Sequence, residues 1–165
     1  MKLLPFENII YKTNLSESEV IKRLNDSIEP EKTLRVNLFG NKSTKDYEGC
    51  ISKQQFKINR IISYRNSFLP RIKGTIQTDA QGTSIHVKMR LHLTVIIFLT
   101  IWCGGVGAGF ITFLSYSIVS NEFNPGIPGT IGMLIFAYTL TMGGFKFESK
   151  KSKNYLSSLF EAHTS

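Results

Sequence analysis

Residues 91–119 read LHLTVIIFLTIWCGGVGAGFITFLSYSIV, and this stretch decides the architecture of the chain. It contains one histidine, His92, and no lysine, arginine, aspartate or glutamate. About 20 consecutive apolar residues cross the hydrocarbon core of a bilayer, so the stretch is long enough to span a membrane. A second apolar run, GIPGTIGMLIFAYTLTMGGFKF, follows at residues 126–147. Each run predicts a membrane-spanning helix.

A turn separates the two runs. The connecting segment SNEFNPGIPG is rich in proline and glycine, which favour turns, and it is too short to hold a folded domain. The pattern predicts a transmembrane helical hairpin within residues 91–147, with spans at about residues 93–119 and 126–145. A buried helix pair in a soluble protein is the alternative. The remaining ~90 residues could not cover two helices that are apolar on every face.

Basic residues flank the predicted hairpin on both sides. Lys88 and Arg90 precede the first span, whereas the turn between the spans carries Glu122 and no basic residue. Four lysines follow the second span: Lys146, Lys150, Lys151 and Lys153. Because basic flanks stay on the cytoplasmic side, both termini are predicted to be cytoplasmic. The first ten residues, MKLLPFENII, lack the apolar core of a secretory signal peptide.

The chain is strongly basic, with a formal net charge of +8. Residues 1–90 hold 16 lysines and arginines against nine aspartates and glutamates. Such an excess is typical of proteins that bind nucleic acid or another anionic surface. Here the charge flanks apolar runs, where membrane topology and anionic lipid account for it. We therefore expect a bilayer with an anionic inner leaflet as the partner, and no nucleic acid.

Residues 1–90 predict a small cytoplasmic domain. Isoleucine, tyrosine and threonine favour a strand at about residues 6–13. Ser16 and Glu19 have the spacing of a helix capping box, so a helix is expected from there to Pro30. Period-two alternation of apolar residues then predicts an antiparallel sheet, with strands at about residues 34–38, 47–51, 56–62, 68–77 and 83–90.

The predicted fold class is α+β: a small antiparallel-sheet domain with one N-terminal and one C-terminal helix, interrupted by the two-helix transmembrane hairpin. The C-terminal helix is amphipathic and is expected at residues 148–165, docked on the 1–90 domain. Its alternative position is on the membrane surface. This order of elements is similar to that of START-like helix-grip folds, which enclose a ligand between a curved sheet and the last helix.

Glycines are concentrated in the predicted spans. Gly105 and Gly109 form a GxxxG pair, and Gly129 and Gly132 lie in the second apolar run. In lipid, close backbone approach over small residues is one of the few ways for helices to gain packing energy. These four glycines are therefore predicted to mediate helix packing or oligomerisation. The packing partner is the other helix of the hairpin, a second copy of the chain or another membrane protein.

Basic and aromatic residues cluster at residues 63–74, which read SYRNSFLPRIKG. Arginine side chains, which can donate paired hydrogen bonds, suit an anionic ligand when aromatic side chains lie beside them. The last predicted strand adds basic side chains on one face, with Ile85 and Met89 on the other. The predicted ligand or headgroup site comprises Tyr64, Arg65, Arg71, Lys73, Lys88 and Arg90. The alternative is a solvated turn followed by an edge strand whose pairing Pro70 limits.

The common catalytic motifs do not occur in the sequence. We therefore predict no catalytic residue, cofactor or metal site. The sequence favours a non-enzymatic, membrane-anchored binding or sensor module of unknown ligand. The alternative is an oligomeric pore-type or membrane-perturbing protein, or an accessory subunit of a membrane complex, because the spans are rich in glycine. An enzyme acting on a lipid or small substrate is a third hypothesis, which rests on the resemblance in element order.

Overall fold

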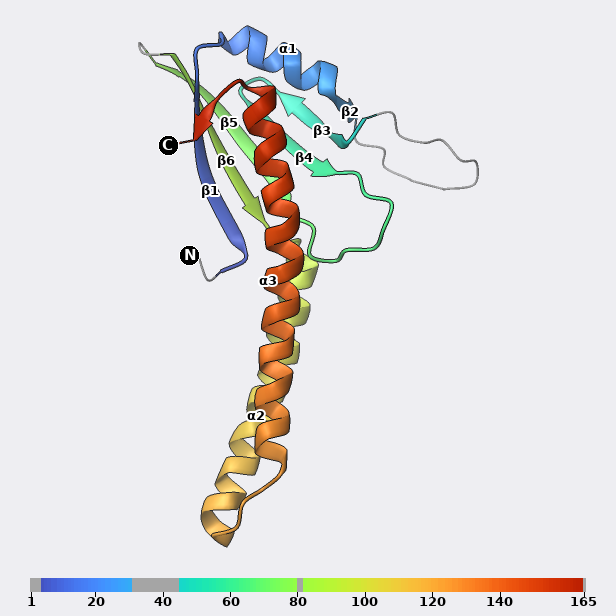
Figure 1. The fold of residues 1–165 in the computed structure, drawn as a ribbon, viewed down its shortest axis with the longest axis vertical. Coiled ribbons are helices and arrows are strands. Elements are labelled where there is room, and N and C mark those ends of the chain that lie inside the picture. The colour runs from blue at the N-terminus through green and yellow to red at the C-terminus, as the bar shows by residue number, and fades with distance from the viewer. Residues whose placement is uncertain (1–3, 31–44, 80–81, 165) are drawn as a thin grey trace.

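The computed structural model describes residues 4–30, 45–79 and 82–164. They form a mixed α/β structure with a sheet at one end of two long helices (Figure 1). The mixed class is confirmed, and the strand predicted at residues 34–38 lies outside the described residues. In chain order the elements are β1 (Phe6–Thr13), α1 (Glu17–Ser27), β2 (Ile28–Pro30), β3 (Tyr47–Ser52), β4 (Gln55–Arg60), β5 (Arg71–Asp79), β6 (Gly82–Arg90), α2 (Leu93–Ser120), α3 (Gly126–Leu159) and β7 (His163–Thr164).

The strands form one sheet in the order β2-β3-β4-β5-β6-β1-β7. β2 and β3 are parallel, with Ile28 opposite Tyr47, whereas the other strand pairs within the described residues are antiparallel. The prediction of an antiparallel sheet is therefore wrong at this edge, because β2 is a short extension of α1 that runs alongside β3. The interpretation of β5 as an edge strand is also wrong, since β5 lies between β4 and β6.

Helix α1 begins at the predicted cap. The Ser16 hydroxyl accepts a hydrogen bond from the backbone N–H of Glu19 at 3.3 Å, which satisfies one of the free amides of the first turn. Val20 and Leu24, four residues apart on one helical face, are fully buried. α1 therefore closes one end of the hydrophobic core above the sheet (Figure 1).

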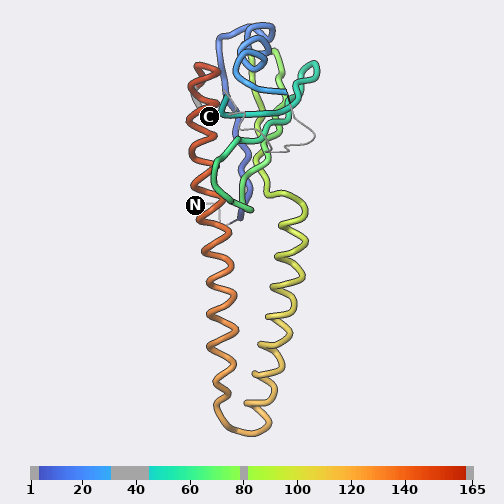
Figure 2. The backbone as a smooth tube through the Cα atoms, turned by 90° about the vertical axis from the view of Figure 1, so that its right-hand side faces the viewer, coloured from blue at the N-terminus to red at the C-terminus, as the bar shows by residue number. Residues whose placement is uncertain are grey.

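Helix α3 is continuous from Gly126 to Leu159. The separate helix predicted at residues 148–165 is therefore wrong: the second apolar run and the amphipathic tail form one rod, followed by the short strand β7. No proline interrupts the helix after its first turn. At 1.5 Å per residue the rod is about 50 Å long, so it extends beyond the apolar run and lies over one face of the sheet (Figures 1 and 2).

Small side chains allow α3 to approach the sheet closely. Ser149 and Ser152 are fully buried, and the Ser152 hydroxyl lies 3.2 Å from the hydroxyl of Tyr47 on β3. Further along the chain, Leu156 and Phe160 enter the core, where the Phe160 ring lies edge-on to Tyr11 with ring centroids 6.0 Å apart. The C-terminal part of α3 is thus built into the domain.

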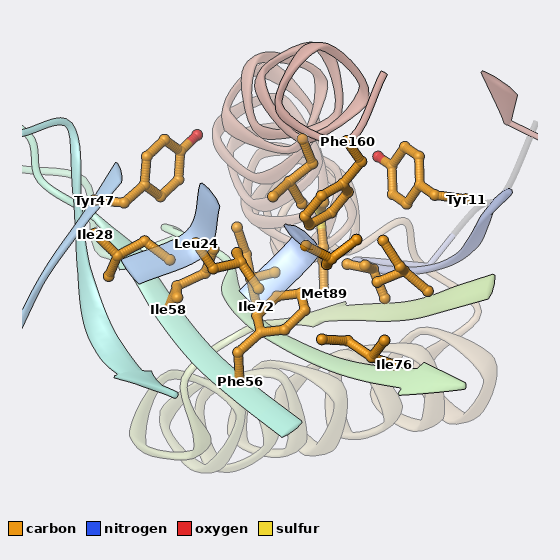
Figure 3. Packing of buried hydrophobic residues seen from close by; sticks show 14 of the residues in the cluster. Tyr11, Leu24, Ile28, Tyr47, Phe56, Ile58, Ile72, Ile76, Met89 and Phe160 are labelled. Carbon is orange, nitrogen blue, oxygen red and sulfur yellow. The ribbon is translucent and has the colours of Figure 1, made fainter. Parts of the chain in front are cut away.

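Apolar side chains fill the space between the sheet and α3 (Figure 3). Phe56 lies across Gly74 on the neighbouring strand, where a Cβ atom would come within 2.0 Å of the ring. Met89 from β6 and Ile72 from β5 pack beside it and are 0–1% exposed. The space between the sheet and α3 is thus filled by the protein's own core.

The remaining parts of α2 and α3 project together from the sheet. The two helices lie side by side and are antiparallel (Figures 1 and 2). Each helix is long and apolar enough to cross a membrane. α2 buries none of its residues, and large side chains such as Ile101 and Ile118 are each 72% exposed. Asn121 ends α2 in the left-handed conformation at φ 53°, which asparagine tolerates better than most residues.

Candidate functional site

On the face of the sheet opposite α3, the described side chains of β4, β5 and β6 are exposed or half-buried. Side chains alternate along its strands, so that Ile72 and Met89 point into the core while Arg71 and Arg90 point outward. The antiparallel register places Arg71 directly opposite Arg90. Two residues further along these strands, on the same face, three exposed lysines lie in a row across neighbouring strands: Lys57 on β4, Lys73 on β5 and Lys88 on β6. We call these five side chains the basic face.

Like charges directly opposite one another destabilise a sheet. At about 4 Å, two unit charges repel by roughly 1 kcal/mol in bulk water and by roughly 4 kcal/mol at the effective dielectric constant of a protein surface. Within the described residues, no ion pair joins the basic face to an acidic side chain. Glu48 lies beyond Asn59, at the far end of the row that contains Arg71. An anion on this face would therefore relieve repulsion among the five cations.

Two hollows mark the basic face. One, of about 480 Å³, lies among Arg71, Lys73, Lys88 and Arg90 and extends to Leu93 and Ile96 at the start of α2. The other, of about 380 Å³, continues along the same strands past Lys57 to His86. An adjoining hollow of about 310 Å³ has mainly apolar walls, formed by Leu4, Pro5, Phe6, Leu91 and Ile96, with Arg90 at its edge. The site thus passes from cationic on the strands to apolar at the helix.

The structure divides the predicted ligand cluster. Arg71, Lys73, Lys88 and Arg90 come together on the basic face. Tyr64 does not join them: its hydroxyl donates a hydrogen bond to Glu148 on α3, on the other side of the sheet. That hydrogen bond, more than burial, raises the pKa of the Tyr64 hydroxyl. Arg65 lies exposed in the segment between β4 and β5. Lys57, which the prediction missed, belongs to the basic face because the register of β4 against β5 places it opposite Lys73.

Two buried carboxylates join the domain to α3. Glu148 is fully buried and accepts hydrogen bonds from Tyr64 and from Arg60 of β4, the latter at 2.5 Å. Glu7 of β1 is paired with Lys146 at 2.5 Å and Lys153 at 3.1 Å. Burial would raise the pKa of the Glu7 carboxyl, but the hydrogen bonds from Lys146 and Lys153 outweigh it and lower the pKa.

Sequence reasoning missed these pairs and counted the lysines after the second apolar run as free flanking charge. Lys146 and Lys153 are seven residues apart, or about two helical turns, and so share a side of α3. The seven-residue spacing of the two lysines was the one feature of the sequence that could have indicated a shared acidic partner. Glu7 therefore neutralises part of the charge that follows the second apolar run.

The glycines singled out in the sequence lie on open surface of the helices. A Cβ atom added at Gly105, Gly109, Gly129 or Gly132 would meet no atom within 4 Å outside its own stretch of helix. Contacts of this kind occur instead at Gly126, next to Phe113, and at Gly144, next to Phe68. The four predicted packing glycines therefore do not mediate the contact between α2 and α3 in this structure.

Comparison with known proteins found no matching family model, curated protein or solved structure. The function of the site is therefore inferred from its geometry alone. Its main elements are the basic face, the hollows at the start of α2 and the two ion-pair clusters on α3.

Proposed function

We propose that the protein is a membrane-anchored module whose basic face binds the phosphate groups of anionic lipids in the leaflet that α2 enters. The observation that carries this proposal is the hollow in which two arginines and two lysines meet the first turn of a helix with no buried residue. A basic surface and an apolar helix at one junction match the two parts of a phospholipid.

The membrane anchor is supported by the exposure of α2 and α3. Monomeric soluble proteins rarely expose contiguous apolar patches larger than a few hundred Å², whereas here the apolar surface extends along both helices. A bilayer would cover this surface. In the proposed topology α2 and α3 both cross the membrane. The sheet domain, which includes both ends of the described chain, lies on the cytoplasmic side, as the basic flanks predict.

The junction between β6 and α2 fixes the basic face relative to α2, the first proposed span. Only Leu91 and His92 separate the strand from the helix, and Leu91 is buried in the core. The His92 side chain accepts a hydrogen bond from the Thr94 backbone at 3.2 Å and so caps the helix. The domain therefore cannot turn freely about a linker, and Arg90 stays within one helical turn of the proposed span.

The chemistry of the basic face suits phosphate. Arginine presents a planar fork that binds two phosphate oxygens, and lysine adds a mobile point charge. Each basic residue near an anionic membrane contributes about 1 kcal/mol of attraction, so the five together supply about 5 kcal/mol. Because the anchor already holds the face near the headgroups, the local lipid concentration is high and modest intrinsic affinity suffices.

Native mass spectrometry of the full-length protein released from nanodiscs tests the proposal. In discs of mixed phosphatidylcholine and phosphatidylglycerol, the wild-type protein should retain phosphatidylglycerol preferentially. Arg71→Gln with Lys88→Gln should remove that preference. Lys12→Gln with Lys22→Gln, which also removes two exposed lysines, should retain it. Equal retention of both lipids by the wild type would refute the lipid-binding function.

A further inference from the structure

The two hollows of the basic face lie one after the other along the strands. The hollow next to α2 is lined by Arg71 and Arg90, which we call the arginine pair. The hollow farther from α2 is lined by Lys57. Lys73 and Lys88 line both hollows and, with Lys57, form the lysine row. The face therefore offers two neighbouring places for an anion, one beside the start of α2 and one farther from it.

The register of the strands sets the distance between these two places. Arg71 lies opposite Arg90, and Lys73 lies opposite Lys88. The two pairs are two residues apart on each strand, which corresponds to about 7 Å along an antiparallel sheet. Extended side chains of the two pairs thus present two separate positive centres. Two phosphates joined by a small polyol can occupy both centres at once.

The charge of the basic face also exceeds what one lipid phosphate supplies. The phosphodiester that joins a phospholipid to its headgroup carries a single negative charge, so it leaves most of the five cations without a counter-charge. Within the described residues, no acidic side chain forms an ion pair with them. A phosphate monoester adds about 1.5–2 negative charges and three acceptor oxygens. A ligand with one group of each kind therefore comes much closer to neutralising the face.

Neutral polar side chains follow the lysine row on the same face. Gln55 lies opposite Thr75, and Thr75 lies opposite His86 on the next strand. All three line the hollow farther from α2. An amide, a hydroxyl and an imidazole can each donate a hydrogen bond to a phosphate or hydroxyl oxygen. A headgroup with hydroxyls beside a second phosphate thus finds hydrogen-bond partners there as well as counter-charge.

We propose that the basic face selects an anionic lipid whose polyol headgroup carries a second phosphate, as a monoester. The phosphodiester lies at the arginine pair, and the monoester lies at the lysine row. This inference rests on the lipid-binding function proposed above and specifies the class of headgroup. The ligand is a lipid and not a soluble phosphate ester, because the hollow at the arginine pair continues to the apolar side chains of Leu93 and Ile96.

The test uses the full-length protein in phosphatidylcholine nanodiscs that also contain phosphatidylinositol and phosphatidylinositol 4-phosphate in equal amounts. The two inositol lipids share the ring and the phosphodiester and differ by one phosphate monoester. By native mass spectrometry, the wild type should retain the 4-phosphate over phosphatidylinositol by about tenfold or more. Lys57→Gln should lower this ratio about fivefold, because Lys57 lines the hollow of the monoester and not that of the phosphodiester.

Lys22→Gln is the matched control. It removes one exposed lysine from α1 that lines neither hollow, so it should keep the wild-type ratio. An unchanged ratio in Lys57→Gln, or an equal fall in both variants, would overturn the inference. Equal retention of the two inositol lipids by the wild type, both above phosphatidylcholine, would refute the second phosphate and leave the proposed function standing. Retention of neither above phosphatidylcholine would refute both.

The soluble headgroup inositol 1,4-bisphosphate distinguishes a lipid from a free phosphate ester. Added to the same discs at the concentration of phosphatidylinositol 4-phosphate, it should leave the retained lipid in place, since it has no chain to lie against the start of α2. Displacement of the lipid at equal concentration would identify a soluble ligand and overturn the assignment to a lipid.

Discussion

Arg60 on β4 lies 2.5 Å from the carboxylate of Glu148 on α3, and that carboxylate is fully buried. The two residues are 88 positions apart in the chain. Their contact lies in the part of α3 that follows the second apolar run. It therefore joins the sheet to the same rigid helix that we propose crosses the membrane.

Arg60→Met should destabilise the protein by about 3 kcal/mol, because removal of one partner leaves a buried carboxylate without its counter-charge. The free energy of unfolding in detergent, from the loss of helical signal, measures the effect. Lys151→Met is the control: its ammonium lies 3.9 Å from the same carboxylate but is 41% exposed, so it should cost less than about 1 kcal/mol. Equal effects of the two substitutions would contradict the assignment of Arg60 as the main partner.

The Glu7 cluster should make stability depend on pH. The pKa of Glu7 is lowered from its ordinary value of 4.5 by the hydrogen bonds from Lys146 and Lys153, which outweigh burial. A lowered folded-state pKa gives stability that is fully present above the unfolded value and is lost as pH falls through the folded one. Wild-type protein should therefore lose stability below about pH 4.5. Glu7→Gln should be less stable at neutral pH and show a smaller loss, measured by unfolding at a series of pH values.

Lys73→Glu should stabilise the sheet while weakening the proposed lipid site. Lys73 has Lys57 on one side and Lys88 on the other, and replacing like-charge pairs with opposite-charge pairs contributes about 0.5–1 kcal/mol. The gain should appear in a zwitterionic detergent and shrink at high salt, because exposed charges are screened. Phosphatidylglycerol retention should fall in the same variant. A loss of both stability and retention would indicate a disrupted sheet instead.

The proposed topology places Cys50 on the cytoplasmic side. Cys50 is exposed on β3 and Cys103 lies on α2, so Cys103→Ser leaves one accessible thiol. A membrane-impermeant maleimide should then label inverted vesicles and not intact cells. Val119→Cys at the far end of α2, added to a chain lacking Cys50 and Cys103, should give the opposite pattern. Labelling of both positions from the same side would exclude a two-span hairpin.

Local sequence patterns predicted several elements correctly. The strand expected at residues 6–13 is β1, and the Ser16 cap begins α1. The apolar face of β6, with Ile85 and Met89, is buried as the alternation predicted. These features depend on residues within one or two turns or on a period of two, so a short stretch of chain carries the signal. The candidate lipid site was predicted in part for the same reason, since Lys88 and Arg90 alternate with the buried positions.

The remaining site residues could not be assigned from local patterns. Tyr64 and Arg71 are seven positions apart and look like one cluster, yet Pro70 precedes the start of β5 and the chain places the two on different sides of the sheet. Lys57 belongs to the basic face only through the register of β4 against β5. Pairing partners across strands are set by long-range contacts, which a single sequence does not display.

The sequence by itself determined the two long apolar helices, the turn between them and the mixed α/β class, because composition and hydrophobic period act over short lengths of chain. Only the tertiary structure decided that α3 continues into the domain, that Glu148 meets Arg60, and that the Thr141 hydroxyl is buried without a hydrogen-bond partner among the described residues. Each of these depends on which distant surfaces pack together, and burial then determines which charged and polar groups need partners.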